Sequence, residues 1–258
     1  MSAKIKVMTF NLRIRVISDG SNYFDRRTAK IRQMIEAEQP DLIGFQEAND
    51  YMADWLTDNL TDYTVIGHGR EADYRGEGMY IAYRKNRFRL HAYHQQALSL
   101  FPKKGGSRLE STDQSKYPRA YACAELILRE SNSPFAFYNI HTDHKGEQAR
   151  LIECALLMRD VAKSPYPFII TGDFNDYPHS SPITLVLSTA PELGTVDATK
   201  HIKGSFHGFK GEVGNCKIDY IFTNLPTNPA ASYAVTDDDN CGNYYSDHHA
   251  LCAIVELP

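Results

Sequence analysis

A short apolar run and a cluster of polar side chains meet in the stretch Phe168-Ile169-Ile170-Thr171-Gly172-Asp173-Phe174-Asn175. The apolar run predicts a buried strand, and Gly172 permits a close approach of the backbone where that strand ends. Asp173 can orient and deprotonate a water molecule, and Asn175 can donate a hydrogen bond to a transition-state oxygen. The alternative is an Asx turn, in which both side chains bond only to local backbone. By itself, the stretch favours neither interpretation.

Three more polar stretches follow or adjoin apolar runs in the same way. They are Thr9-Phe10-Asn11-Leu12-Arg13, Gln46-Glu47 and Ser246-Asp247-His248-His249. Rigid scaffolds display catalytic groups at strand ends, and Mg2+ is held by one or two carboxylates together with water. Glu47 alone is better explained as a solvated loop residue. With Asn11 and Asp247 in similar positions, however, it predicts a metal site.

Histidines stand beside two of these strand ends. His248 can contact a phosphate, and Asp219 is the candidate for fixing the tautomer of its ring. His141 follows an apolar run and is a second candidate phosphate ligand. Its spacing to His144 also allows a zinc pair, but only that spacing supports zinc. His249 is out of phase with His248, so we expect it to be structural.

Strands and helices alternate along the chain. Helical spacing of apolar residues predicts helices over residues 23–39, 51–60, 147–162 and 182–188. Apolar or alternating runs predict strands at residues 5–12, 42–45, 63–66, 79–83, 88–93, 121–128, 135–140, 168–171, 218–222, 232–235 and 250–257. We expect residues 79–83 and 88–93 to form a hairpin. The order predicts an α/β fold of two β-sheets packed face to face with helices outside, in one domain over residues 1–258.

The helix predicted from residue 147 to residue 162 carries an apolar stripe, which consists of Ala149, Ile152, Ala155, Leu156 and Val161. Such a stripe predicts that one face of the helix packs against a sheet. Residues 101–119 form the longest polar segment without a predicted element. A loop of that length inside a compact domain is usually functional or disordered. We therefore expect this loop, together with residues 67–76, to shape the pocket.

Composition limits the class of protein. The chain has 258 residues, of which 42% are apolar and 23% charged, as in ordinary soluble globular proteins. Its net charge of -4 gives no overall attraction to nucleic acid, although a local basic patch stays possible. No stretch approaches the roughly 20 apolar residues of a membrane span, and residues 1–7 lack the apolar core of a signal peptide. The five cysteines lack CxxC spacing and predict reduced thiols in a cytoplasmic protein.

Taken together, the polar stretches resemble the endonuclease/exonuclease/phosphatase superfamily, the fold of DNase I. The matching elements are Thr9-Phe10-Asn11, Gln46-Glu47, Asn139-Ile140-His141, Gly172-Asp173-Phe174-Asn175, Ile218-Asp219-Tyr220-Ile221 and Ser246-Asp247-His248. Each is weak alone, but their order along nearly the whole chain is highly specific. The resemblance implies a DNase I-like four-layer sandwich of two mixed β-sheets flanked by helices. Residues 139–150 and 206–209 are similar to small bacterial members whose substrates are often undefined.

The resemblance also implies roles for individual residues. Asn11, Glu47 and Asp247 would surround Mg2+ or Mn2+. Asp173 would orient the attacking water, and Asn175 would help to hold the water and the phosphate.

Two imidazoles would then bracket the scissile phosphate. By resemblance, His248 would pair with Asp219, and His141 with Glu77. Arg119 looks like the family's phosphate-contacting arginine.

These residues predict a monomeric hydrolase that depends on Mg2+ or Mn2+ and acts on a phosphate-ester substrate. A small mono- or diester, or a nucleotide end, is favoured because the chain lacks a long basic insertion to grip DNA. The alternatives are a nuclease acting on DNA or RNA and a catalytically inactive binding protein on the same fold. Further candidate substrate contacts are the basic residues Lys103, Lys104, Arg108 and Lys116 and the aromatic residues Tyr74, Tyr117, Tyr177 and Phe206.

Overall fold

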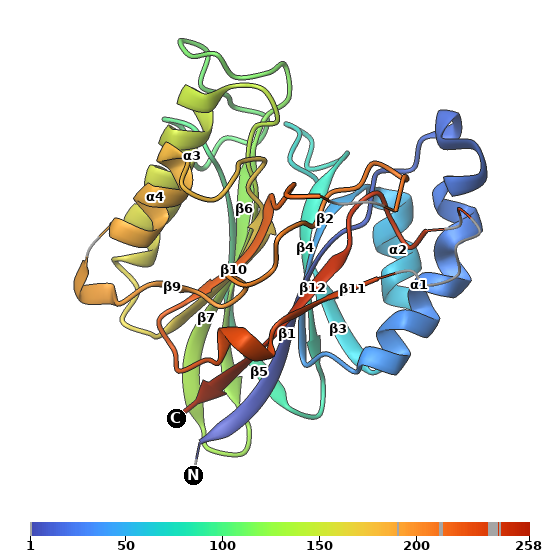
Figure 1. The fold of residues 1–258 in the computed structure, drawn as a ribbon. Helices are drawn as coiled ribbons and strands as arrows, with labels where there is room; N and C mark the ends of the chain where they lie inside the picture. Colours follow the sequence, from blue (N-terminus) through green and yellow to red (C-terminus); the bar gives the residue numbers. More distant parts are fainter. Residues whose placement is uncertain (1, 190, 212–213, 237–241, 243) are drawn as a thin grey trace.

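Two six-stranded sheets face each other in the described part of this computed structural model, which comprises residues 2–189, 191–211, 214–236, 242 and 244–258 (Figure 1). The strands of the first sheet, in spatial order, are β11 (Tyr233–Val235), β12 (Ala250–Leu257), β1 (Ala3–Asn11), β2 (Leu42–Ala48), β4 (Gly78–Arg84) and β3 (Tyr63–Ile66). Those of the second are β5 (Phe88–Ala97), β6 (Ala120–Leu128), β7 (Ser133–His141), β8 (Phe168–Asp173), β10 (Asp219–Thr223) and β9 (Val196–Asp197).

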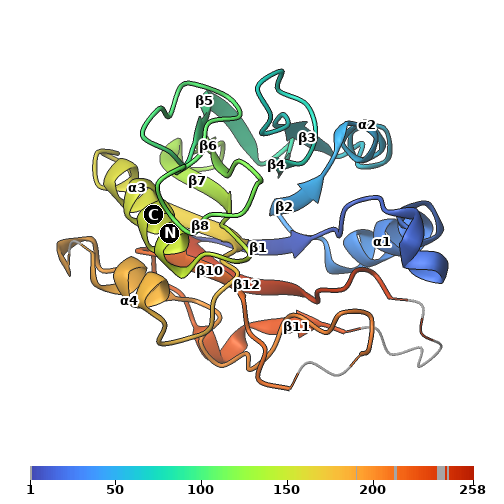
Figure 2. The same ribbon diagram turned by 90° about the horizontal axis from the view of Figure 1, so that it is seen from above.

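Helices cover the outer face of each sheet (Figures 1 and 2). Helices α1 (Phe24–Glu38) and α2 (Asp50–Asn59) pack on the first sheet, and α3 (Glu147–Val161) and α4 (Ser181–Ser188) on the second. Short 3-10 helices lie at Ile17–Asn22, Pro191–Leu193 and Pro229–Ala231. The predicted fold class, two mixed sheets packed between layers of helices, is confirmed.

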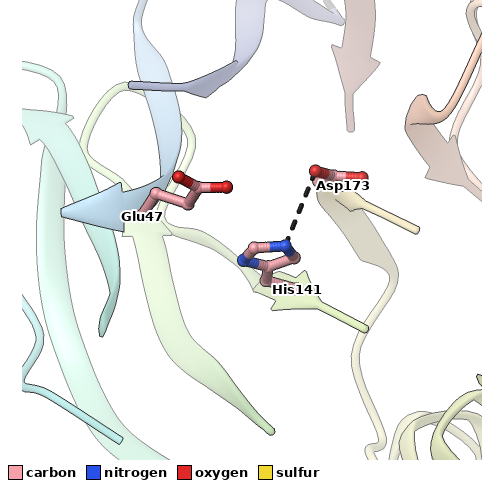
Figure 3. A group of neighbouring side chains, drawn as sticks. All are labelled: Glu47, His141 and Asp173. Carbon is pink, nitrogen blue, oxygen red and sulfur yellow. Dashed lines mark ion pairs between the residues drawn. The ribbon is translucent and has the colours of Figure 1, made fainter. Parts of the chain in front are cut away.

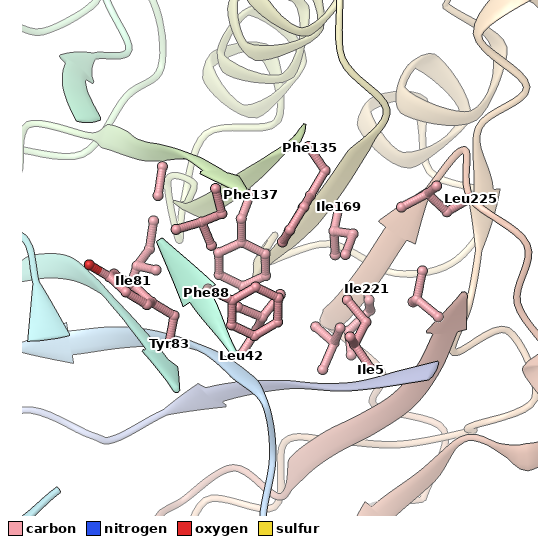
Figure 4. Packing of buried hydrophobic residues seen from close by; sticks show 14 of the residues in the cluster. Ile5, Leu42, Ile81, Tyr83, Phe88, Phe135, Phe137, Ile169, Ile221 and Leu225 are labelled. Carbon is pink, nitrogen blue, oxygen red and sulfur yellow. The ribbon is translucent and has the colours of Figure 1, made fainter. Parts of the chain in front are cut away.

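Apolar side chains from both sheets fill the space between them (Figure 4). Ile5 and Leu42 come from the first sheet, and Phe88, Phe137 and Ile221 from the second; each is at most 1% exposed. Burying one such side chain contributes roughly 1.5–3 kcal/mol. Each sheet is covered by helices on one face and by the other sheet on the other face. The strands therefore consist of continuous apolar runs.

The predicted hairpin of residues 79–83 and 88–93 is wrong. Strand β4 pairs with β2 on one side and β3 on the other, so neither of its edges is free. Strand β5 pairs with β6 in the second sheet instead. The short link after Arg84 therefore carries the chain from one sheet to the other. Its turn-like residues predict a reversal of direction correctly, but they cannot indicate which strand becomes the neighbour.

Strand directions bring the predicted polar stretches to one end of the sandwich. Strands β1 and β2 are parallel, as are β7 and β8, so their carboxyl ends share an edge within each sheet. In that register His141 lies opposite Asp173. Strand β10 is antiparallel to β8, and its first residue, Asp219, pairs with Asp173. Loops at this end of the sheets therefore hold the candidate site.

No helix in the described part of the chain combines the length and the apolar character needed to span a bilayer. The cysteines of the described residues, Cys123, Cys154, Cys216 and Cys252, are free thiols, in agreement with the predicted reduced state. Cys241 lies outside the described residues.

Candidate active site

A buried polar network joins the two sheets beneath the site. Gln46 donates to the side-chain oxygen of Asn139 at 2.6 Å, and Asn139 donates to the backbone oxygens of Phe45 and Tyr80 at 2.8 and 3.0 Å. A side chain at Gly44 would place its Cβ 2.0 Å from Oγ1 of Thr171, so only glycine fits at this approach. Buried amides bonded on both sides fix the register of the sheets relative to each other.

Asn11, at the end of β1, connects two candidate catalytic carboxylates. Its Nδ2 lies 3.1 Å from Oε1 of Glu47 and 2.9 Å from Oδ2 of Asp173. Glu47 also accepts a hydrogen bond of 2.9 Å from the backbone N–H of Ile14. Burial opposes ionisation of Glu47, but this bond and the charge of His248 outweigh burial and lower its pKa. Glu47 is therefore held as a carboxylate facing the second sheet.

Asp247 lines the same cavity as Glu47. Its Oδ2 is 3.7 Å from Nε of Arg13, and Arg13 is bonded to Asp19 at 3.0 Å. Burial raises the pKa of Asp247, and the nearby charge of Glu47 raises it further. Two carboxylates that repel each other in this way are an arrangement that a bound cation would stabilise.

Potential metal-ligand atoms also gather around Asp173. Among the described residues, one group comprises Glu47, His141 and Asp173, with its ligand atoms within 4.8 Å of one another (Figure 3). A second group comprises Asp173, Asp219 and His248. Asp173 is therefore common to both groups, one of which contains the predicted metal ligand Glu47 and each of which contains a candidate imidazole.

The carboxyl group of Asp173 serves two purposes in this structure. Its Oδ1 accepts a 2.9 Å bond from the backbone of Asn175, so the Asx turn of the alternative interpretation is present. Its Oδ2 lies 3.6 Å from Nε2 of His141 and 3.8 Å from Nε2 of His248. Burial, together with the charge of Asp219, raises the pKa of Asp173 to about 7. A base poised near neutrality is suited to proton transfer.

His248 pairs with Asp219, as the resemblance implies. Nδ1 of the ring lies 2.8 Å from Oδ2 of Asp219, and the ring of Phe206 packs against it edge-on at 4.9 Å. Burial acts to lower the pKa of His248, but the carboxylates of Asp219 and Asp173 outweigh it and raise the pKa well above its ordinary value. His248 is therefore a protonated imidazole whose Nε2 faces the cavity.

His141 lacks its expected partner. Glu77 pairs with Arg70 at 2.7 Å, and Nδ1 of His141 has no hydrogen-bond partner among the described residues. Burial lowers the pKa of His141 well below its ordinary value, and the charges of Arg119 and Arg70 lower it further. His141 is thus neutral, in contrast to His248.

The zinc alternative gains no support from His144. Its Nδ1 lies 2.8 Å from Nη2 of Arg119, and His144 belongs to none of the groups of three potential metal ligands found among the described residues. Arg119 also contacts Asp143 at 3.3 Å, which fixes the guanidinium at the edge of the cavity. His249 is buried and stacks on His207 at 4.4 Å, in agreement with its predicted structural role.

A cavity of about 480 Å3 connects these groups. The residues that line it include Glu47, Glu77, Arg119, His141, Asp173, Asn175, Asp247 and His248. The two predicted loops contribute Arg70 and Tyr117 as well as Arg119, and Phe206 lies beside His248. Of the other aromatic and basic candidates, Tyr74 and Lys103 line a separate small cavity, and Lys104 and Arg108 line one beside α3. Sequence reasoning gave no role to Arg13, although it ends one of the quoted polar stretches, and it missed Arg70, because no local pattern distinguishes that residue from other charged loop residues.

The comparison with known families agrees with this geometry. The sequence profile of the Endonuclease/Exonuclease/phosphatase family matches residues 8–248. The chain belongs to this family. As a member of the endonuclease/exonuclease/phosphatase family, it falls among hydrolases that act on phosphate esters. The curated protein sequences contain no match to it.

Solved structures of endonuclease/exonuclease/phosphatase proteins share the fold over almost the whole chain. One from Bacteroides vulgatus is 25% identical, with a TM-score of 0.90, and the match covers 99% of this chain and 100% of that one. A mannosyl-6-phosphatase from Bacteroides thetaiotaomicron is 23% identical, with a TM-score of 0.80 and coverage of 98% and 100%. D. rerio TDP2, complexed with single strand DNA product, is 16% identical, with a TM-score of 0.76 and coverage of 99% and 100%.

Proposed function

We propose that the chain is a divalent-metal-dependent phosphoesterase in which Asp173 activates a water molecule for in-line attack on a small phosphate ester. One observation carries this proposal: Oδ2 of Asp173 lies 3.6 Å from Nε2 of His141 and 3.8 Å from Nε2 of His248, and Asp173 shares a group of potential metal ligands with Glu47. A base flanked by two imidazoles at the floor of a cavity is an arrangement suited to phosphoryl transfer to water.

The donor set fits Mg2+ or Mn2+. Glu47 and Asp247 offer hard carboxylate oxygens, which these ions prefer over the nitrogen and sulfur ligands typical of zinc. Asn11 is the third proposed ligand, although its amide oxygen accepts a 2.9 Å bond from the backbone of Arg13 here. When bound, the cation would supply positive charge that stabilises the pentavalent transition state.

Side chains of the protein would carry out the proton transfer and hold the phosphoryl oxygens. Asp173 would hold the attacking water and accept its proton. Protonated His248, held by Asp219, would donate to a phosphoryl oxygen on which negative charge develops. Neutral His141 and the amide of Asn175 would hold the other oxygens. Glu77 would act through Arg70, the residue with which it pairs, rather than through His141.

A small substrate is supported by the cavity and the charge. The polar cavity of about 480 Å3 fits a sugar phosphate or a nucleotide end, and the similar mannosyl-6-phosphatase is consistent with that class. Action on DNA or RNA is the second candidate, because the similar TDP2 was solved with single strand DNA product. The single domain over residues 1–258, the monomeric state and the cytoplasmic location stay predictions.

The test is a substrate panel with purified protein. Sugar phosphates, nucleotides, phosphoinositide headgroups, single-stranded oligonucleotides and plasmid DNA are assayed with Mg2+, with Mn2+ and after chelation. We expect metal-dependent release of phosphate or cleavage products, and a loss of at least ~100-fold in Asp173→Asn. Asp58→Asn, an exposed change on α2, is the matched control. A folded Asp173→Asn variant with near-normal turnover would rule out this mechanism.

A further inference from the structure

Two arginines enter the cavity from different loops, on the side of His141. Arg70 lies in the loop between β3 and β4, and Arg119 is the residue directly before β6. Their side chains are almost fully buried, with residue exposures of 4% and 2%. The backbone of Arg70 links the two loops, because it accepts a 3.0 Å bond from Gly106. The two guanidinium groups are therefore positioned by the fold and are not mobile surface charges.

Each guanidinium has one carboxylate partner and keeps donors that are not used. Glu77 contacts Nη2 of Arg70, while Nε and Nη1 of Arg70 have no partner among the described residues. Asp143 contacts Nε of Arg119, and Nη1 of Arg119 likewise has no partner within that part of the chain. A buried donor without a partner is destabilising, so such donors usually face a ligand or ordered water. Three of them lie on one side of this site.

The two guanidinium groups act on each other electrostatically. Burial lowers the pKa of Arg70, and the charge of Arg119 lowers it further, so the two guanidinium groups repel each other across a short distance. The ring of Tyr117 lies 5.7 Å from the Arg70 guanidinium and closes the outer wall. On the opposite side of the cavity, Arg13 is neutralised by Asp19 and Asp247. The excess of donors is thus confined to the His141 side.

A terminal phosphate offers the acceptor oxygens that these N–H donors lack. A phosphomonoester has three non-bridging oxygens and a charge between about -1.5 and -2 at neutral pH, since its second pKa is near 6. A phosphodiester has two such oxygens and a single charge. In the proposed mechanism, His248, His141 and Asn175 would already donate to the two non-bridging oxygens of a diester. The guanidinium fork of Arg is the group that best binds additional phosphate oxygens.

We propose that Arg70, together with Arg119, makes this site select a terminal phosphomonoester over a phosphodiester. The inference rests on the proposed phosphoesterase function, and it assigns Arg70 a role in specificity. Arg70 binds the third phosphate oxygen, Glu77 holds Arg70 in place, and Tyr117 shields the pair from solvent.

The kinetic test compares two substrates that share a leaving group, para-nitrophenyl phosphate and methyl para-nitrophenyl phosphate. We expect Arg70→Gln to lower kcat/KM on the monoester by about 30-fold, as for the loss of a charge-assisted hydrogen bond, and on the diester by less than about 3-fold. Arg70→Lys should recover part of the preference. Arg75→Gln, an exposed change in the same loop, should leave both rates unchanged. Equal losses on both substrates in Arg70→Gln would overturn the inference.

A binding test separates this inference from the proposed function. Phenylphosphonate, a dianion that resists hydrolysis, and its methyl monoester are titrated calorimetrically into the metal-free protein. We expect wild-type protein to bind the dianion more tightly than the methyl monoester. In Arg70→Gln the ratio of the two affinities should fall by about 10-fold. If neither nitrophenyl ester is hydrolysed, the proposed function fails, but loss of the binding preference in Arg70→Gln still supports the subsite. Unchanged phenylphosphonate binding in folded Arg70→Gln protein would refute it.

Discussion

Nδ1 of His248 lies 2.8 Å from Oδ2 of Asp219, although the two residues are 29 positions apart and are held by strands of different sheets. His248 precedes β12 of the first sheet, and Asp219 begins β10 of the second. The contact therefore exists only when the two sheets are packed together. It stabilises the protonated ring and turns Nε2 toward Asp173.

Removing the charge of Asp219 should impair turnover without unfolding the protein. In Asp219→Asn the amide cannot stabilise the imidazolium, so we expect kcat to fall by about 100-fold and the pKa of His248 to fall. His248→Ala should lose at least as much activity. Steady-state kinetics and NMR titration of the ring measure the two effects. A folded Asp219→Asn variant with wild-type kcat would show that the pair is only structural.

Activity should require a divalent metal ion, and the affinity for that ion should depend on Glu47. Chelation should abolish activity, and Mg2+ or Mn2+ should restore it, because the site offers oxygen ligands. Glu47→Ala should shift the activating metal concentration upward by 10-fold or more, roughly the effect of losing one ligand. Calorimetric titration of Mg2+ into wild-type and variant protein provides an independent measure. The assignment is wrong if activity survives chelation or returns only with zinc.

Glu153 should make the free energy of unfolding depend on pH around neutrality. This buried carboxyl on α3 accepts a 2.8 Å bond from the backbone of Asp143, and burial raises its pKa to about 8. The folded protein holds this proton up to about pH 8, whereas the unfolded chain releases it near the ordinary pKa of 4.5. Because the folded state binds more protons in this window, the contribution of Glu153 to stability decreases as pH rises.

Glu153→Gln should remove this dependence, since the amide can accept the same bond without ionising. Relative to wild type, the variant should gain about 3 kcal/mol of unfolding free energy between pH 5 and pH 8. Urea unfolding at both pH values measures the gain, and Glu36→Gln, an exposed change on α1, is the control. A constant difference between Glu153→Gln and wild type at the two pH values would contradict the prediction.

Small phosphate esters should be better substrates than long duplex DNA. Duplex binding depends on many Lys and Arg contacts to phosphates, and Lys104 and Arg108 lie outside the candidate site. Rates on plasmid DNA, short oligonucleotides and small esters are compared at one salt concentration. Efficient nicking of plasmid, with little action on the other substrates, would instead identify a duplex nuclease.

Local patterns predicted most elements because each depends on neighbours in the sequence. The run Leu42–Phe45 is a strand in the structure, and Pro40 follows the end of α1 as expected. The stripe predicted for α3 was only partly right. The residues of α3 that are buried are Ala149, Glu153, Cys154, Leu157, Met158 and Val161. The face that packs inward includes Glu153, which accepts a buried hydrogen bond from the backbone of Asp143.

The sequence predicted which residues line the candidate site better than it predicted which side chains contact each other there. Strand-end motifs identified Asp173, His248 and Glu47, because such motifs are contiguous in sequence. The contact expected between Glu77 and His141 is not formed, since Glu77 lies against Arg70. Pairings of this kind depend on where loops from different sheets meet, and no local pattern encodes that.

The sequence alone determined the family, the alternation of strands and helices, and the kinds of side chain at the strand ends. These properties depend on residue type and short-range spacing. Tertiary structure alone decided that β4 and β5 separate into different sheets, that Asp173 approaches one neutral and one protonated imidazole, and that Arg70 and Arg119 enter the cavity on the same side. Each depends on burial and on electrostatic fields from residues far apart in sequence, and those arise only when the two sheets pack together.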